Sequence, residues 1–174
     1  MATKTKTESA PSFMDPALGP WVLVSEVYWM ANKLLERRFY HLGVSASQAR
    51  VLLVLHYAPE PIKPSAIATL LFQETQSITG ILHRTEDRGW VNRMPDPDDR
   101  RAVRLELTAA GQQLTEEIIA ISQGLYDELF DAPLSAREAQ QVEAALKKVR
   151  AQGFNMPETD FKLRRAKQYP IWSD

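Results

Sequence analysis

The sequence of 174 residues contains no cysteine. This absence excludes disulfides, zinc sites with Cys ligands, thiol catalysis and cysteine-based peroxide sensing. The three histidines, His41, His56 and His83, lie far apart and show no metal-ligand spacing such as His-x-x-x-His. We therefore expect neither a metal nor any other cofactor.

Long apolar runs are also absent, because no segment approaches the roughly 20 apolar residues that cross a bilayer. The first twenty residues are polar and rich in threonine, whereas a signal peptide needs an apolar segment. We therefore expect a cytoplasmic protein with no membrane partner.

Motifs of the common enzyme classes are missing as well. There is no Gly-rich phosphate loop and no nucleophile elbow, and the acidic residues of segment 95–101 lie in a predicted turn, where we expect little burial. An enzyme is not expected. The net charge of −1 gives no general attraction to nucleic acid, so any such function must come from the local placement of Arg and Lys.

The content of 44% hydrophobic and 25% charged residues predicts a folded globular chain. Residues 1–19 have no periodicity and are predicted to be a flexible arm. From Pro20 to Leu42 apolar residues recur at helical spacing, which predicts a long dimerisation helix within residues 20–44. The tail, residues 153–174, mixes aromatic and basic residues; it either docks on the dimer or forms a basic arm that touches DNA.

Residues 45–111 have the pattern of a DNA-reading lobe. Ser45 and Gln48 form a capping box for a second helix. A short third helix over residues 64–72, a polar turn at 73–75 and a fourth helix that ends at Gly89 together predict a helix-turn-helix.

A β-hairpin is predicted directly after this unit. Residues 90–94 are strand-like, residues 95–101 are turn-rich, and residues 102–107 alternate between apolar and polar side chains. A hairpin at this place would be the wing of a winged helix-turn-helix.

Two further long helices are predicted within residues 108–152. Thr108 can cap the first, and Ser135 with Glu138 forms a capping box for the second. Their apolar stripes are too extensive for so small a lobe to bury, which favours a homodimer. The predicted fold is therefore mainly α with a small β-hairpin wing, a winged helix-turn-helix with N- and C-terminal dimerisation helices.

Three segments carry a resemblance to the MarR (multiple antibiotic resistance regulator) family. They are Ile-Leu-His-Arg-Thr-Glu-Asp-Arg-Gly-Trp-Val at 81–91, Asp-Pro-Asp-Asp-Arg-Arg at 96–101 and Leu-Glu-Leu-Thr-Ala-Ala-Gly at 105–111. Two positions depart from the family pattern. Thr85 replaces a bulky apolar residue, which we expect to loosen packing, and Gly80 replaces a residue that is often polar or basic.

The resemblance implies that the tip of the wing reaches the minor groove of double-stranded DNA. Arg101 would insert there, Asp99 would hold it or a neighbouring arginine, and Arg100 would meet a phosphate. The alternative is a solvated charged turn with local ion pairs.

The outward positions of the fourth helix are the other predicted DNA contacts. Gln76 and Thr79 are the preferred base readers, and Ser77 offers a further donor or acceptor. His83 and Arg84 are expected on phosphates, with Ser65 as one more phosphate contact. Each of them could instead be an exposed polar residue without a partner.

The resemblance also implies a small organic effector, often an aromatic or phenolic acid. Trp29, Lys33 and Tyr40 lie on one stripe of the first helix and could line its pocket. Packing against the partner subunit explains these residues equally well.

These observations predict a dimeric regulator of transcription that binds a pseudo-palindromic operator, in the mode of a repressor relieved by its effector. The alternative is a winged-helix adaptor that binds another protein and has no preference for a DNA sequence.

Overall fold

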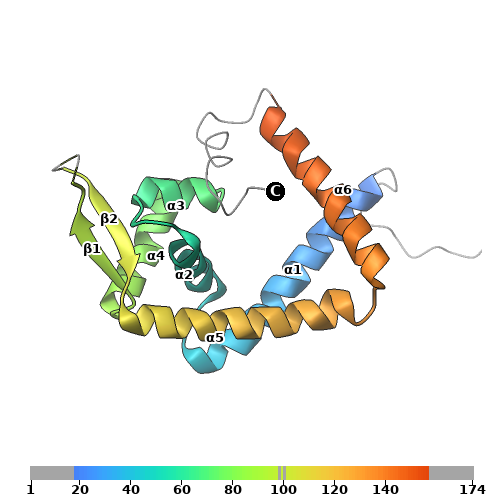
Figure 1. Cartoon of the computed structure of the whole chain (residues 1–174), viewed down its shortest axis with the longest axis horizontal. Coiled ribbons are helices and arrows are strands. Elements are labelled where there is room, and N and C mark those ends of the chain that lie inside the picture. The colour runs from blue at the N-terminus through green and yellow to red at the C-terminus, as the bar shows by residue number, and fades with distance from the viewer. Residues whose placement is uncertain (1–17, 98, 100, 157–174) are drawn as a thin grey trace, which may run out of the picture.

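The structure is a computed structural model that describes residues 18–97, 99 and 101–156. Figure 1 shows α5 as a long bar, with α2, α3, α4 and the β-hairpin at one end and the crossing helices α1 and α6 at the other. The predicted fold, mainly α with one hairpin, is confirmed. The elements are α1 (Gly19–Phe39), α2 (Ala46–Tyr57), α3 (Pro64–Leu70), α4 (Thr75–Asp87), β1 (Val91–Pro95), β2 (Val103–Leu107), α5 (Ala109–Tyr126) and α6 (Ala136–Asn155).

The helix starts follow the capping residues seen in the sequence. Both predicted capping boxes form, Ser45 with Gln48 at α2 and Ser135 with Glu138 at α6. Hydrogen bonds from the side chain and then the backbone of Ser135 lower the pKa of the Glu138 carboxyl group. Thr108 caps α5, because its Oγ1 accepts a hydrogen bond of 3.0 Å from the backbone of Gly111.

Several boundaries differ from the sequence-based prediction. The third helix ends at Leu70, two residues before the predicted end at Phe72, because Phe72 has a positive φ. The first helix stops being α-helical at Phe39 and continues as a 3-10 turn over Tyr40–Leu42. A π-helical turn over Asp127–Asp131 follows α5 directly. The last helix extends through Asn155, three residues into the segment predicted as a tail. Residues 1–17 and 157–174 lie outside the described part of the chain.

Helices α1 to α5 and strand β2 each contribute at least one large, buried apolar side chain to the core of the lobe. Only Phe39 of α1 is buried, so the lobe holds α1 by its last turn. The other large, fully buried apolar side chains are Leu52 and Val51 of α2, Ile67 of α3, Ile78 and Leu82 of α4, Leu105 of β2 and Ile118 of α5.

A compact joint connects the end of α4, both strands and the start of α5. Gly89 ends the α4 segment with a φ of 70°, a conformation that residues with a side chain rarely adopt. The Thr108 hydroxyl donates to the carbonyl of Gly89 at 2.7 Å, and the Thr108 amide donates to the carbonyl of Trp90 at 3.0 Å. These bonds fix the direction of α5 relative to α4.

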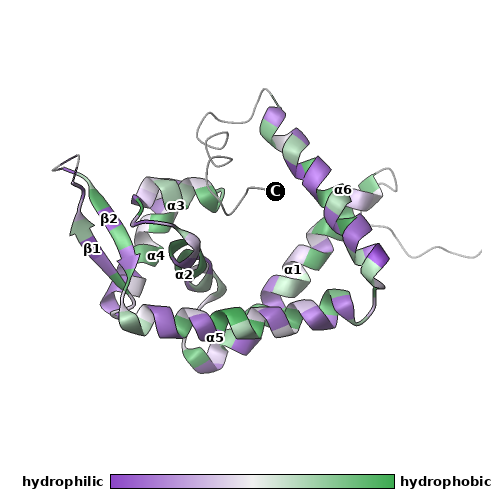
Figure 2. Cartoon of the chain, viewed as in Figure 1, coloured by the Kyte–Doolittle hydropathy of each residue, from purple (hydrophilic) through white to green (hydrophobic). Residues whose placement is uncertain are grey.

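The outer helices expose large apolar side chains instead of burying them. Figure 2 shows hydrophobic positions along both α1 and α6. On α1 these include Trp21, Leu23, Val24 and Val27, and on α6 they are Val142, Leu146 and Val149. Surface of this kind on an extended pair of helices is typical of an interface between subunits. In the described residues, no helix is long and apolar enough to cross a membrane.

We predict that Gly111→Ala destabilises the fold. A Cβ at Gly111 would lie 1.9 Å from the carbonyl oxygen of Trp90, a backbone atom that cannot move without disturbing the joint. The loss is expected to be at least about 1–3 kcal/mol of unfolding free energy, measured by urea denaturation.

The matched control is Gly124→Ala in the same helix, where the nearest atom is the Arg38 side chain at 4.0 Å. This change should stabilise the protein by about 0.5–1 kcal/mol, because alanine is the better helix former. Equal effects of the two substitutions would contradict the steric explanation.

Candidate nucleic-acid interface

Helix α4 buries one face and exposes the other. Ile78, Ile81, Leu82 and Thr85 point into the core. The opposite face is polar and accessible, as the sequence predicted. Exposed side chains on it are Gln76, Ser77, Thr79, His83 and Arg84, and Ser65 is exposed in the first turn of α3.

Some of these side chains already have partners within the chain. The Thr79 hydroxyl donates to the carbonyl of Thr75 at 2.9 Å, which leaves its oxygen lone pairs and its methyl group for an outside contact. Nδ1 of His83 lies 4.0 Å from the Glu86 carboxylate, which also accepts a hydrogen bond of 2.8 Å from Arg93. We therefore expect His83 to favour phosphate contact less than its position alone suggests.

The two departures from the family pattern have structural explanations. Thr85 is fully buried, and its hydroxyl donates to the carbonyl of Leu82 at 2.7 Å. The expected loosening of the packing there is therefore wrong, because the one polar group of Thr85 is satisfied inside the helix. A Cβ at Gly80 would lie 3.7 Å from Nη1 of Arg84, so the guanidinium group of Arg84 lies alongside the bare backbone of Gly80.

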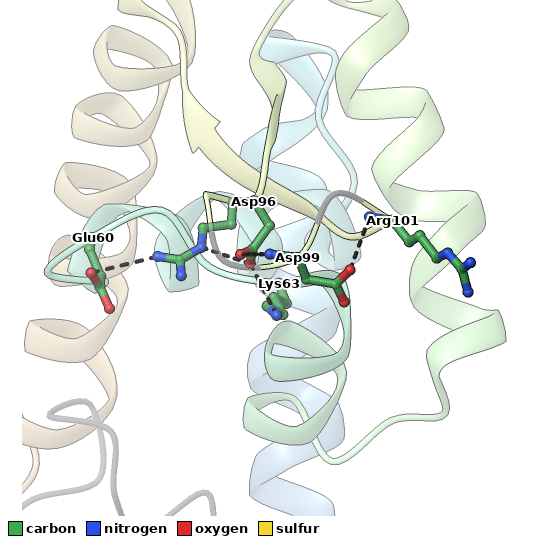
Figure 3. A network of polar contacts seen from close by, with 6 residues as sticks. Glu60, Lys63, Asp96, Asp99 and Arg101 are labelled. Carbon is green, nitrogen blue, oxygen red and sulfur yellow. Dashed lines mark hydrogen bonds and ion pairs between the residues drawn. The ribbon is translucent and has the colours of Figure 1, made fainter.

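The wing is fastened to the rest of the lobe by a buried carboxylate (Figure 3). The side chain of Asp96 has no exposed surface, and its Oδ2 lies 3.0 Å from Lys63 Nζ and 3.0 Å from Arg104 Nε. Arg104 also reaches Glu60 at 3.7 Å. The expectation of little burial in the wing turn is wrong for Asp96. Two cations offset the cost of removing this charge from water.

The backbone adds a second connection at the same place. Ile62, next to Lys63, exchanges hydrogen bonds with Leu105 of β2, at 3.2 Å from its amide and 2.9 Å to its carbonyl. The segment before α3 therefore lies beside the hairpin through both its backbone and its side chains.

Hydrogen bonds continue from Asp96 to the tip of the wing. Oδ1 of Asp96 accepts from the amide of Asp99 at 3.1 Å, and Oδ1 of Asp99 accepts from the amide of Arg101 at 3.0 Å. The side chain of Arg101 extends away from Asp99 in Figure 3 and is exposed. Asp99 thus holds the backbone of Arg101 rather than its guanidinium group. Arg100 lies outside the described residues.

Sequence reasoning missed Asp96, Lys63 and Arg104. The turn-rich segment signalled that an aspartate side chain would organise the wing, but several aspartates stand there. Which of them reaches the loop before α3 depends on the tertiary fold.

A hollow of about 450 Å³ lies between the end of α1 and the C-terminal part of α5. Its lining consists of Arg37, Arg38, His41, Ile121 and Gly124. Arg38 is paired with Glu128, whereas Arg37 makes no ion pair among the described residues. The hollow combines positive charge with an apolar wall.

None of the three residues predicted for an effector pocket belongs to the lining of this hollow. Trp29 and Tyr40 are largely exposed, and Lys33 pairs with Glu36 at 3.1 Å. Tyr40 makes an edge-to-face contact with His41 of the lining, at 5.9 Å between ring centroids. Within the described ranges, no group of His, Asp and Glu side chains could hold a metal ion.

Comparison with known proteins decides the family. The model of the MarR family matches residues 42–102. The multiple antibiotic resistance protein MarR of Escherichia coli K12 is 32% identical over 128 residues, which are 73% of this chain and 88% of that protein. The chain belongs to the MarR family.

Other relatives agree with this assignment. The transcriptional repressor MprA of E. coli K12 is 30% identical over 124 residues, which are 69% of this chain and 70% of MprA. A crystal structure of a mutant E. coli MarR complexed with operator DNA has a TM-score of 0.69 at 31% identity and covers 77% of this chain and 94% of that one.

A second solved structure shares the fold at lower identity. CouR from Rhodococcus jostii RHA1, bound to p-coumaroyl-CoA, has a TM-score of 0.69 at 22% identity and covers 78% of this chain and 95% of that one. Proteins of the MarR family are transcription regulators and not enzymes, so this chain is a winged helix-turn-helix regulator of transcription, as its sequence predicted.

We predict that Asp96→Asn destabilises the lobe by on the order of 2 kcal/mol in urea denaturation. The amide keeps the shape of the carboxylate but removes the negative charge that lies between Lys63 and Arg104. Asp87→Asn, at the exposed end of α4, is the matched control and should stay within about 0.5 kcal/mol. A loss no greater than that of the control would refute the fastening role of Asp96.

Proposed function

We propose that this regulator binds as a symmetric dimer to a pseudo-palindromic operator and represses transcription until a small organic acid binds. Each subunit places α4 in a major groove and the tip of the wing in the adjacent minor groove. The observation that carries the proposal is the exposed polar face of α4 on the same rigid lobe as the exposed Arg101.

The groove contacts follow from the chemistry of the exposed side chains. Gln76 can read base edges with both a donor and an acceptor, and Thr79 with its free lone pairs and methyl group. Arg84 and Ser65 meet phosphates. The Arg101 guanidinium suits the negative potential of a narrow minor groove, and Asp99 and Asp96 hold its backbone in place.

Dimerisation follows from the apolar surface of α1 and α6. Trp21, Val24 and Val27 are each more than two-fifths exposed, and Leu146 and Val149 of α6 are similarly accessible. A second copy that covers this surface would present two α4 helices on one side of the DNA. The MarR structure with operator DNA supports such a partner.

The effector is proposed to occupy the hollow at Arg37 and His41. An arginine without a carboxylate partner suits a carboxylate or phosphate group, and Ile121 offers an apolar wall to the remainder of the ligand. The complex of CouR with p-coumaroyl-CoA supports an aromatic acid or its thioester. The hollow is lined by residues of both α1 and α5, so a ligand there favours a dimer in which the distance between the two lobes is different. The shift between the two dimer states cannot exceed the difference in the ligand's affinity for them.

Operator selection with Arg101→Ala tests the DNA proposal. Selection from random duplexes with the parent protein should return a pseudo-palindrome whose half-sites lie about 10 base pairs apart, bound by one dimer. Arg101→Ala should reduce the affinity by about 1–3 kcal/mol through loss of the minor-groove contact, measured by fluorescence anisotropy.

Arg84→Ala separates phosphate from base contacts in the same assay. It should lower the salt dependence of binding by about one unit of slope without changing the selected sequence. If selection returned no palindrome and Arg101→Ala bound DNA like the parent, the adaptor hypothesis would replace this one.

A pair of variants tests the effector site. Arg37→Gln should raise the concentration of aromatic acid or thioester that releases the operator by about tenfold, because one charge-assisted hydrogen bond contributes about 1.5–3 kcal/mol. Lys33→Gln, one turn earlier and already paired with Glu36, should leave that concentration close to the parent value. The reverse order of effects would place the effector at the stripe of Trp29, Lys33 and Tyr40.

A further inference from the structure

The turn between α3 and α4 holds a residue in an unfavourable conformation. Phe72 has a φ of 54° and is the one non-glycine residue with positive φ in the described part of the chain. The amide of Gln73 donates to the carbonyl of Ala68 at 2.9 Å, and the amide of Phe72 donates to that of Thr69 at 3.2 Å. This pair of bonds is a Schellman motif, in which the position of Phe72 is usually glycine.

A phenylalanine at this position opposes the local backbone preference, because its Cβ crowds the chain when φ is positive. Such conflicts persist where the surrounding structure compensates for them, and they gather at sites that have a further role. The compensation at Phe72 comes from a distant part of the chain.

The ring of Phe72 packs against the ring of Phe154, with centroids 5.9 Å apart and planes inclined by 32°. Phe154 lies in the last turn of α6 and is only 6% exposed, and it is the one buried residue of that helix. Figure 1 shows the end of α6 on the same side of the molecule as α3, far from the crossing of α6 with α1. The last turn of α6 therefore contacts the turn that follows α3.

This contact lies directly before the recognition helix. Glu74 is the N-cap of α4, two residues after Phe72, so any displacement of the turn moves the first turn of α4, where Gln76 stands. The rest of α6 leaves Val142, Leu146 and Val149 exposed for a second copy. A helix that enters the dimer interface thus ends on the turn of the helix-turn-helix.

We propose that Phe154 is a positioning residue, which holds Phe72 and thereby the start of α4 at a fixed place relative to the dimerisation helices. Its effect on DNA rests on the proposed function. The aromatic contact itself can be measured without DNA.

A double-mutant cycle in urea denaturation tests the contact. With Phe154 present, Phe72→Gly relieves the backbone but loses the aromatic pair, whereas in the Phe154→Ala background that pair is already absent. Phe72→Gly should therefore be less destabilising in the Phe154→Ala background, and its effect on the unfolding equilibrium constant should differ between the two backgrounds by roughly two- to tenfold. The same effect in both backgrounds would overturn the proposal.

Two further readouts distinguish positioning from a general contribution to stability. At a temperature where every variant is fully folded, Phe154→Ala should weaken operator binding at least about threefold, and the amides of Gln76 to Ile78 should exchange faster while those of the β-hairpin do not. A purely structural residue would leave the affinity of the folded protein unchanged.

Gln152→Ala, exposed two residues earlier on α6, is the control and should match the parent in all three measurements. Coupling in the cycle together with unchanged DNA affinity and exchange would overturn the positioning role. If Arg101→Ala also failed to weaken DNA binding, the proposed DNA function itself would be wrong. In that case hydrogen exchange of the α4 amides would be the one measurement that decides the positioning role of Phe154.

Discussion

The geometry of the DNA-reading lobe depends on the close approach of two backbones, the first turn of α5 and the start of β1. Gly111 allows this approach, because any side chain there would occupy the carbonyl of Trp90. Thr108 then joins the end of α4 to the start of α5 through its hydroxyl and its amide. The recognition helix, the hairpin and the long helix toward the dimer therefore share one joint. The family pattern of Leu-x-Leu-Thr followed by glycine has its physical basis here.

The second constraint is electrostatic. A fully buried carboxylate is costly unless cations and hydrogen-bond donors surround it, and Asp96 has Lys63, Arg104 and the amide of Asp99. The Asp96 carboxylate therefore connects the wing to the loop before α3. In the proposed complex with DNA, a wing held in this way would lose little further freedom on binding, which favours affinity.

Local sequence signals predicted the elements well. Capping boxes at Ser45 and Ser135, the cap at Thr108 and the end at Gly89 depend on neighbours within a few residues, so the sequence alone displays them. Helical periodicity likewise predicted which face of α4 would be exposed.

What escaped prediction depends on contacts between distant residues. Asp96 and Lys63 are 33 positions apart, and the hollow of Arg37 and His41 exists only where α1 passes α5. Phe72 was predicted as the last residue of the third helix, and nothing in the sequence signalled its positive φ or its partner in α6. Predicting the contacts that position the site therefore required the tertiary fold, whereas most residues on its surface could be predicted from the sequence.

Helix α1 connects the DNA-reading lobe to the exposed apolar surface proposed for dimerisation. Phe39 is its one buried residue and lies in its last turn, so the lobe holds the helix at one end while its first half exposes Trp21 and Val24. In the proposed dimer, a small displacement of α1 near Phe39 would become a larger one in the interface between the subunits. Arg37 and His41 stand on either side of Phe39 in the sequence. The proposed effector would therefore act close to Phe39, where little movement is needed to change the separation of the two α4 helices.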